Sequence, residues 1–185
     1  MRVIAGKYRS RTIQMPKGAE ARPTKDRVRE ALFNILGASV NGAAVLDAFA
    51  GSGAFGIEAV SRGAKRVVFV DIDKRCIVTV KKNLEALGIS DDAASLIRAD
   101  AIMAFDTLER RKEKFDIVLF DPPYYSDTAK KSLIKIDARD ILTPRCIVVV
   151  EHHKNDALPE ELDVITSYRI ARYGDIRLSF YRLKK

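Results

Sequence analysis

The sequence predicts an α/β fold in which helices cover both faces of a mostly parallel sheet, and three observations predict it. Short apolar runs alternate along the chain with segments whose apolar residues recur every three or four positions, which is typical of βαβ units. A glycine-rich turn, Gly51-Ser52-Gly53, joins the first such run to the first helical segment. Near the C-terminus, Tyr173-Gly174-Asp175 separates two apolar stretches, as in an antiparallel hairpin. The 185 residues correspond to about one domain.

Each expected element follows from the hydrophobic pattern of its segment. Apolar runs predict buried strands, and apolar residues at helical spacing, such as Ile77, Val80, Leu84 and Leu87, predict helices. In order along the chain we expect strand 45–49, helix 55–62, strand 66–70, helix 74–87, strand 95–97, helix 101–111, strands 115–120 and 146–150, and the closing strands 164–172 and 176–182. Because strands and helices alternate, the sheet is expected to be largely parallel.

The first 40 residues are expected to form an arm, followed by a main domain at residues 41–185. Residues 2–4 and 12–15 can pair as a small hairpin. A helix is expected from Thr24, capped by its own hydroxyl, to Leu36. Its apolar stripe can dock on the main domain, which leaves basic side chains on the open side, namely Arg22, Lys25 and Arg29.

The arm also carries most of the net positive charge. The formal net charge of the chain is +8, and residues 1–30 hold nine Lys and Arg against three Asp and Glu. Basic side chains near phosphates release condensed counterions, so such a stretch suggests a polyanionic partner. For a basic stretch alone, a solvated and solubilising surface is the alternative.

Several classes of protein are excluded or disfavoured by composition. No apolar run is long enough for a membrane span, and the N-terminus lacks the apolar core of a signal peptide, so a cytoplasmic protein without a membrane partner is expected. The two cysteines, Cys76 and Cys146, form no CxxC pair, which argues against a disulfide framework or a zinc knuckle. The pair His152-His153 lacks further ligands at suitable spacing, so no metal site is expected.

The glycine-rich turn is a candidate cofactor site. Gly51, Gly53 and Gly56 match the pattern GxGxxG, which serves dinucleotides and other adenosine cofactors, although a purely structural turn is an alternative. The preceding Asp47 would repel a pyrophosphate and suits a cationic or zwitterionic ligand better. Twenty residues after Gly51, Asp71 ends the second strand, where its carboxylate could accept both ribose hydroxyls and would repel a 2′-phosphate.

Two acidic residues near these strands have competing interpretations. Asp100 follows the third strand and could bind an adenine amino group, or it could cap the next helix. Asp73 is expected to be the cap of the helix that follows it. Asp71 itself could also be a solvated strand end, so its role depends on the glycine turn nearby.

The tetrapeptide Asp121-Pro122-Pro123-Tyr124 is the candidate catalytic site. Two prolines cannot continue a central strand, so the chain must leave the sheet at its carboxyl edge, where ligands bind in open α/β folds. The Asp121 carboxylate and the Pro122 carbonyl can accept the two hydrogens of an exocyclic amine, and Tyr124 can stack on its ring. This arrangement frees the nitrogen lone pair, and the matching electrophile is the sulfonium methyl of S-adenosylmethionine.

Together these motifs resemble a known family. The segments that carry the resemblance cover nearly the whole chain: Arg2-Val3-Ile4-Ala5-Gly6 with Arg9 and Arg11, Arg22-Pro23-Thr24, Asp26 to Glu30, Leu32-Phe33-Asn34, Leu46 to Gly56, Ser61 to Ala64, and Asp121 to Tyr124. They are similar to the bacterial 16S ribosomal RNA guanine-N2 methyltransferases, which are S-adenosylmethionine-dependent enzymes of class I. Ala5 and Ser10 stand where that family usually has glycine.

The resemblance implies a Rossmann-like fold with seven strands, of which the last is antiparallel. It also implies a monomeric enzyme that methylates N2 of one guanine in 16S rRNA, of the guanine-966 type, within an assembling 30S subunit. Asp47, Phe49, Gly51 and Gly53 would shape the cofactor turn, with the ribose at Asp71 and adenine at Asp100. The arm residues expected to contact RNA are Lys7, Arg9, Arg11, Arg22, Thr24, Arg27 and Arg29.

Three alternatives remain open from the residues. An adenine-N6 or cytosine-N4 methyltransferase fits because the same tetrapeptide suits any exocyclic amine. A ribosome-assembly or RNA-binding protein without turnover could keep the fold, although the intact Asp121 and glycine turn count against it. A nicotinamide oxidoreductase would use the glycine turn for its cofactor.

Overall fold

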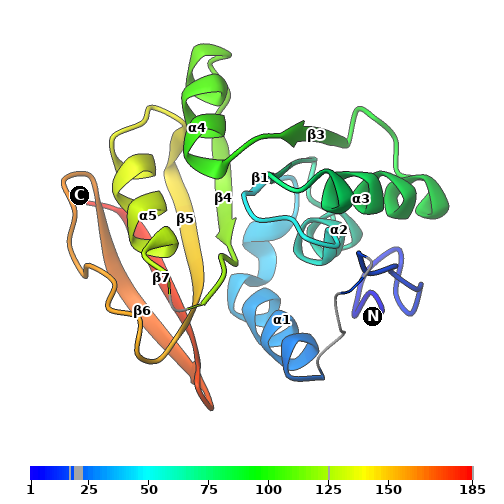
Figure 1. Cartoon of the computed structure of the whole chain (residues 1–185), viewed down its shortest axis with the longest axis horizontal. Helices are drawn as coiled ribbons and strands as arrows, with labels where there is room; N and C mark the ends of the chain where they lie inside the picture. Colours follow the sequence, from blue (N-terminus) through cyan, green and yellow to red (C-terminus); the bar gives the residue numbers. More distant parts are fainter. Residues whose placement is uncertain (17, 19–22, 125, 185) are drawn as a thin grey trace.

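The chain forms a sheet of seven strands with helices on both faces (Figure 1). The computed structural model describes residues 1–16, 18, 23–124 and 126–184, with backbone alone at 23–25. β7 runs opposite to the other six strands, which are parallel to one another, and this confirms the predicted fold class. The strands are β1 (Ala44–Asp47), β2 (Arg66–Asp71), β3 (Ala94–Arg98), β4 (Phe115–Phe120), β5 (Leu142–His153), β6 (Ile165–Tyr173) and β7 (Ile176–Leu183).

The strand order creates a natural binding position at the middle of the sheet. The order is β3-β2-β1-β4-β5-β7-β6, so the chain moves outward from β1 in one direction and then restarts from β4 in the other. β1 and β4 are parallel neighbours, with Asp47 paired to Leu119. In open α/β sheets, ligands bind beyond the carboxyl ends of strands at such a reversal. The segments that follow Asp47 and Phe120 are those that carry the predicted motifs.

The strands are buried on both faces because helices pack against each side. One core cluster joins alternate strand residues to α1 (Pro23–Leu36), η1 (Gly37–Val40), α2 (Ala54–Ser61) and α3 (Lys74–Leu87). The other joins the remaining strand residues to α4 (Ala101–Arg110) and α5 (Thr128–Asp137). Val67 and Phe69 belong to the first cluster, and Val68 and Val70 to the second. This alternation explains why β2 is an uninterrupted apolar run.

The N-terminal hairpin is anchored to α2 by buried polar contacts. Arg2 and Thr12 form the predicted antiparallel bridge. The carboxylate of Glu58, which is fully buried, accepts the amides of Ile4 at 2.8 Å and Ala5 at 3.0 Å. A Cβ at Gly6 would lie 1.8 Å from the Ser61 carbonyl oxygen, so only glycine fits there. The hairpin therefore shares the core of the sheet domain.

The structure corrects several expected boundaries. α1 begins at Pro23, where the fixed φ of proline suits a first helical turn, and η1 follows it directly from Gly37. β5 is twelve residues long and includes His152 and His153, which were expected in a loop after the strand. The helix α5 was not predicted. Ser10 has φ of 67°, the left-handed conformation that glycine adopts at lower cost.

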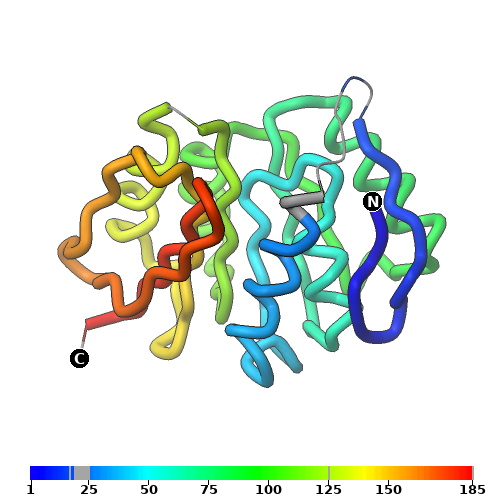
Figure 2. The backbone as a smooth tube through the Cα atoms, turned by 90° about the horizontal axis from the view of Figure 1, so that it is seen from below, coloured from blue at the N-terminus to red at the C-terminus, as the bar shows by residue number. Residues whose placement is uncertain are grey.

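The two ends of the chain form hairpins on opposite sides of α1. Figure 2 shows the N-terminal hairpin in blue, α1 beside it, and the β6–β7 hairpin in orange and red beyond α1. Buried Asp137, at the end of α5, accepts the amides of Asp163, Val164 and Ile165 and so fixes the start of β6. Within the described ranges, no helix has the length and apolarity that a membrane crossing needs.

Candidate active site

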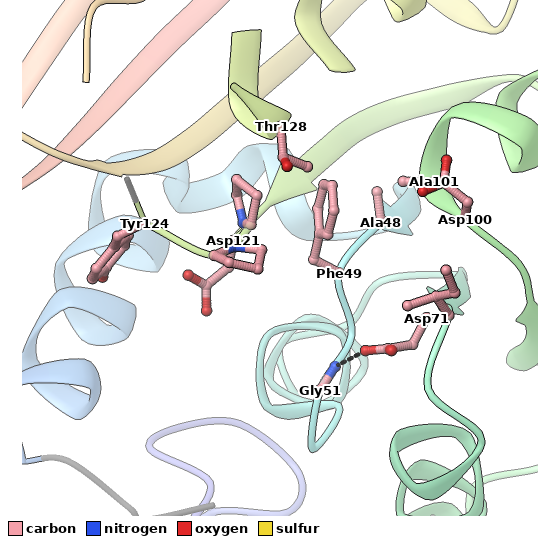
Figure 3. Close-up of a pocket in the computed structure, with 12 residues that line it drawn as sticks. Ala48, Phe49, Gly51, Asp71, Asp100, Ala101, Asp121, Tyr124 and Thr128 are labelled. Carbon is pink, nitrogen blue, oxygen red and sulfur yellow. Dashed lines mark hydrogen bonds between the residues drawn. The ribbon is translucent and has the colours of Figure 1, made fainter. Parts of the chain in front are cut away.

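A cavity of about 550 Å³ lies at the carboxyl edge of the sheet, where β1, β2, β3 and β4 end. This volume is within the range of small-molecule sites, about 300–1,000 Å³. Figure 3 shows the labelled residues across it, from Tyr124 through Asp121 and Phe49 to Asp71 and Asp100. Eight predicted positions line it: Phe49, Gly51, Asp71, Asp100, Asp121, Pro122, Pro123 and Tyr124. Four further residues also line the cavity and were not predicted: Ala48, Ile72, Ala101 and Thr128.

Asp47 and Gly53, which were predicted to shape the cofactor turn, are not among the residues that line the cavity. Asp47 is 1% exposed, and its Oδ2 accepts the amide of Gly56 in the first turn of α2 at 2.9 Å. Gly53 precedes α2 with φ of 81°, a left-handed conformation that favours glycine. The hydrogen bond from Gly56 to Asp47 and the conformation of Gly53 therefore fix the start of α2 relative to the end of β1.

Burial raises the pKa of Asp47 to about 7, and the nearby carboxylates of Asp121 and Asp71 add to the effect. An unfolded Asp has a pKa near 4, so only the native state retains this proton between about pH 4 and 7. The free energy of unfolding contributed by this group therefore falls as pH rises through that window, by up to about 1.4 kcal/mol per unit.

Asp47→Asn should remove this pH dependence, because the amide oxygen can still accept from Gly56 but cannot ionise. The free energy of unfolding of the variant minus that of the wild type should increase by on the order of 2–4 kcal/mol as the pH rises from 4 to 7.5. Urea unfolding at several pH values measures the difference. Asp92→Asn, at an exposed position, is the matched control. Parallel pH profiles of wild type and Asp47→Asn would contradict the raised pKa.

Asp71 is held by backbone amides at the end of β2. Its Oδ2 accepts from Gly51 at 2.8 Å, which Figure 3 marks by a dashed line, and its Oδ1 accepts from Asp73 at 2.8 Å. Each carboxylate oxygen has a further lone pair for a ligand hydroxyl. The residue therefore connects the two loops that border the cavity while it faces into it.

Asp100 and Asp73 both cap helices. Asp73 accepts the Arg75 amide at 2.7 Å and caps α3, as predicted. Asp100 accepts the Ile102 amide at 2.9 Å and caps α4, and it also lines the cavity. Capping and ligand binding are compatible here because a carboxylate accepts several hydrogen bonds. Beside it, the Ile72 side chain is 66% exposed at the cavity wall, so it offers an apolar surface.

The charge of the cavity distinguishes between cofactor classes. Its lining includes the carboxylates of Asp71, Asp100 and Asp121 and contains no Lys, Arg or His among the described residues. A pyrophosphate would be repelled there, which argues against a nicotinamide dinucleotide. A ligand with a sulfonium cation and a free ribose fits this lining.

The tetrapeptide Asp121-Pro122-Pro123-Tyr124 leaves β4 beside the last residues of β5, which continues to His153. Phe120 pairs with Val150 in the sheet, so Glu151 on β5 lies next to the exit of the chain. The Tyr124 hydroxyl donates to Glu151 Oε1 at 2.5 Å, and the Tyr124 ring is 6.4 Å from that of His153. Glu151 is 1% exposed. It was missed in the sequence, although an acid at the end of the run Val148-Val149-Val150 was the available signal.

Neither histidine and neither cysteine lines the main cavity, although His153 lies near the Tyr124 ring and Cys76 borders a second hollow beside the cavity. His152 Nε2 lies 2.8 Å from Ser179 Oγ, its Nδ1 lies 3.0 Å from the His153 carbonyl oxygen, and burial lowers its pKa. Cys146 is buried in the core of β5. The described part of the chain contains no group of three or more His, Cys, Asp or Glu that could hold a metal ion.

The arm residues proposed to contact RNA fall into different environments. Lys7, Arg9 and Arg27 are exposed, and Arg11 donates to the Ala86 carbonyl at 2.9 Å. Arg22 and the Thr24 side chain lie outside the described residues. None of these four described arm residues lines the cavity.

The expected position of Arg29 on the open side of α1 is wrong. Its side chain is 2% exposed, donates to the Arg2 carbonyl at 2.6 Å and lies 3.3 Å from Asp26 Oδ1. A guanidinium buried between carboxylates is a structural link between α1, the hairpin and Glu58. Arg29 does border a second hollow of about 400 Å³, which shares Phe49, Gly51 and Asp121 with the main cavity.

Comparisons with known proteins agree with this description. The family described as "Conserved hypothetical protein 95" matches residues 1–182. The chain is 37% identical over 182 residues to "Putative rRNA methyltransferase YlbH" of Bacillus subtilis, with 98% of both chains covered. It is 35% identical to "Ribosomal RNA small subunit methyltransferase D" of Haemophilus influenzae, with 92% of both covered.

Solved structures give the same fold. "Putative methyltransferase yhhF" from Escherichia coli has a TM-score of 0.83 at 28% identity, over 100% of this chain and 98% of that one. A structure described as SMU.776 complexed with SAH shares the fold at 18% identity, with a TM-score of 0.71, 88% of this chain and 50% of that one.

The sheet, the glycine turn and the tetrapeptide at the reversal of strand order define an α/β methyltransferase. The chain belongs to the family described as Conserved hypothetical protein 95, as the match over residues 1–182 shows. At the level of individual proteins, the chain is similar to the small-subunit methyltransferase D of Haemophilus influenzae.

Proposed function

We propose that the protein transfers a methyl group from S-adenosylmethionine to the exocyclic N2 of a guanine in 16S rRNA. The observation that carries the proposal is the placement of Asp121 and Tyr124 beside an anionic cavity at the reversal of strand order. The names of the relatives support ribosomal RNA as the substrate. The resemblance in the sequence supports guanine N2, of the guanine-966 type.

The cofactor fits the residues that line the cavity. Asp71 would accept the ribose hydroxyls, and Asp100 with Ile72 and Ala101 would border the adenine. Gly51 has φ of 55°, and no atom lies within 4 Å of the position that a Cβ would occupy there. The turn therefore leaves open space beside Gly51 for the cofactor. S-adenosylmethionine, when bound, supplies a methyl carbon made electrophilic by the sulfonium.

The tetrapeptide would prepare the nucleophile. Asp121 and the Pro122 carbonyl accept the two hydrogens of the target amine, which pulls its lone pair out of conjugation with the ring. Tyr124 stacks on the base and holds it in place. The nitrogen then forms a bond to the methyl carbon as the carbon–sulfur bond breaks, and one N–H proton leaves to water or to Asp121. Positioning supplies most of the rate in such an in-line displacement.

Selection of the RNA must come from outside the cavity. The same tetrapeptide suits adenine N6 and cytosine N4. The target base must therefore be selected by the RNA contacts that bring it to the cavity. Exposed Lys7, Arg9 and Arg27 would contact phosphates of the small subunit. The single sheet domain accords with a monomer that acts on an assembling 30S particle. Salt-dependent binding follows from such contacts.

The test is labelled methyl transfer from S-adenosylmethionine to small subunits from cells that lack this enzyme, with nucleoside analysis of the product. Label in N2-methylguanosine at one nucleotide is expected. Label in N6-methyladenosine or N4-methylcytidine would assign one of the alternative bases. Binding of subunits without any transfer would instead identify a non-catalytic assembly protein.

Glu151→Gln should lower turnover by acting through Tyr124. A charged acceptor makes a stronger hydrogen bond than a neutral one, so the variant holds the ring less firmly. We expect kcat to fall about tenfold while affinity for S-adenosylhomocysteine stays unchanged. Glu161→Gln removes an exposed carboxylate in a surface ion pair and is the control.

A double-mutant cycle separates this role from a general loss of stability. In a Tyr124→Phe background the hydroxyl is absent, so Glu151→Gln should have little further effect on kcat. If the two substitutions reduce kcat independently, the proposed action of Glu151 through Tyr124 is incorrect.

A further inference from the structure

The β6–β7 hairpin carries a second concentration of positive charge, distant from the arm. Its two strands contain four arginines, Arg169, Arg172, Arg177 and Arg182, and no acidic residue. The acid of the turn, Asp175, is paired with Lys154 at 2.8 Å. Across the described ranges, no carboxylate lies within 4.0 Å of any of the four guanidinium groups.

Two of these arginines face each other. Arg172 pairs directly with Arg177 in the antiparallel register, and like charges at paired positions destabilise a sheet. β6 is an edge strand, and a charge of either sign would protect such an edge from pairing with another chain. Edge protection therefore does not explain why all four charges are positive, whereas an external polyanion does.

The register places the other two arginines on the face of the sheet that carries Tyr124. Paired residues share a face and the faces alternate along each strand. Glu151, which binds the Tyr124 hydroxyl, pairs with Leu178, and His153, near the Tyr124 ring, pairs with Ile176. Phe180 and Arg182 continue this face along β7, and Tyr173 and Arg169 continue it along β6.

Aromatic rings lie between these cations. The Arg169 guanidinium is 5.9 Å from the Phe180 ring centroid, and that of Arg182 is 5.2 Å from the Tyr168 centroid. Tyr168 is 40% exposed, and Tyr173 is half-buried at the end nearer His153. Exposed rings on which bases can stack, combined with cations that neutralise phosphates, are what unpaired RNA requires.

We propose that Tyr168, Arg169, Tyr173 and Arg182 form a hairpin track that binds unpaired RNA flanking the target nucleotide. The inference rests on the proposed function, because Tyr173 continues the row of paired residues that starts at His153, near the Tyr124 ring. It lies beyond α1 from the basic N-terminal hairpin, as Figure 2 shows for the two hairpins. The RNA would then contact the protein on both sides of the tetrapeptide Asp121 to Tyr124. The hairpin track would hold the RNA strand that leads to Tyr124.

The test compares two matched double variants. Arg169→Gln with Arg182→Gln neutralises the track, and Arg110→Gln with Arg111→Gln removes the same charge from exposed positions at the end of α4, on the other face of the sheet. Binding to small subunits that lack the modification is measured at several salt concentrations, together with kcat, KM, thermal unfolding and affinity for S-adenosylhomocysteine.

The track variant should bind subunits about tenfold or more weakly, with KM raised to match and kcat little changed. The slope of log K against log salt should become shallower by about 1–2, since two phosphate contacts are lost. Arg169→Lys with Arg182→Lys keeps both charges and should retain most of the affinity. Thermal unfolding and S-adenosylhomocysteine affinity should match the wild type.

Three outcomes would overturn the hairpin track. These are wild-type affinity in the glutamine variant, a loss no larger than in the α4 control, or a loss that does not depend on salt. Failure of the proposed function gives a different result, because the wild type itself would then transfer no methyl group to the subunits.

Discussion

Asp121→Ala is expected to abolish methyl transfer while it leaves S-adenosylhomocysteine bound within a few-fold of the wild-type affinity. The carboxylate accepts a hydrogen of the target amine, and the variant offers no acceptor in its place. Loss of a positioned charged group of this kind costs about 10²–10⁴ in rate. Single-turnover methyl transfer to unmodified small subunits measures the effect, and calorimetry measures cofactor affinity.

Asp121→Asn refines this prediction. The amide oxygen can accept one hydrogen but carries no charge, so we expect an intermediate rate between wild type and Asp121→Ala. Asp140→Asn, at an exposed position remote from the cavity, is the control and should retain full activity. A turnover number near the wild-type value in Asp121→Ala would show that the carboxylate has no part in activating the amine.

Gly56→Ala is expected to destabilise the protein and to abolish cofactor binding together. Gly56 is in α2, and its φ is outside the left-handed region, so the backbone conformation alone does not require glycine. Space requires it, because a Cβ would lie 2.2 Å from Cε1 of the buried Phe69 ring. Overpacking of this kind costs about 1–3 kcal/mol.

The loss of binding follows from the contact between the helix and the strand. If α2 moves away from Phe69, the 2.9 Å hydrogen bond from the Gly56 amide to Asp47 is broken and the glycine turn shifts. Denaturant unfolding and S-adenosylhomocysteine titration measure the two effects. Phe69→Leu in the same chain shortens the obstructing side chain and should recover part of both. No recovery in the double variant would mean that α2 does not pack on Phe69 as described.

The elements with strong local patterns were predictable from the sequence. α3 matches its predicted bounds because its apolar residues keep a helical period and Asp73 caps its start. β4 matches because it is an apolar run that two prolines end. α5 was missed because lysines interrupt its apolar residues: Lys130 and Lys131 come before Leu133, and Lys135 comes before Ile136. β5 was predicted too short because polar residues flank its apolar run, Arg145 before it and Glu151 to His153 after it, whereas pairing with β4 and β7 extends the strand past them.

The candidate site was predictable where a residue type implied its chemistry. Asp71 and Asp121 were found because they follow apolar strands at a recognisable spacing, and both line the cavity. Charge alone does not tell whether an arginine is buried, so Arg29 was assigned to the surface although Glu58 and Asp26 enclose it. Glu151 and the hairpin track depend on which residues pair across β5, β6 and β7, and a single sequence does not specify that register.

The most direct test of the account is a structure of the protein bound to S-adenosylhomocysteine and an unmodified small subunit or rRNA fragment. We expect the target amino nitrogen about 3 Å from the Asp121 carboxylate and the Pro122 carbonyl, with the base against Tyr124. The cofactor sulfur should lie on the side of the nitrogen opposite to these two acceptors. A complex in which the cofactor lies away from the glycine turn, or in which no base reaches this corner, would contradict the central claim.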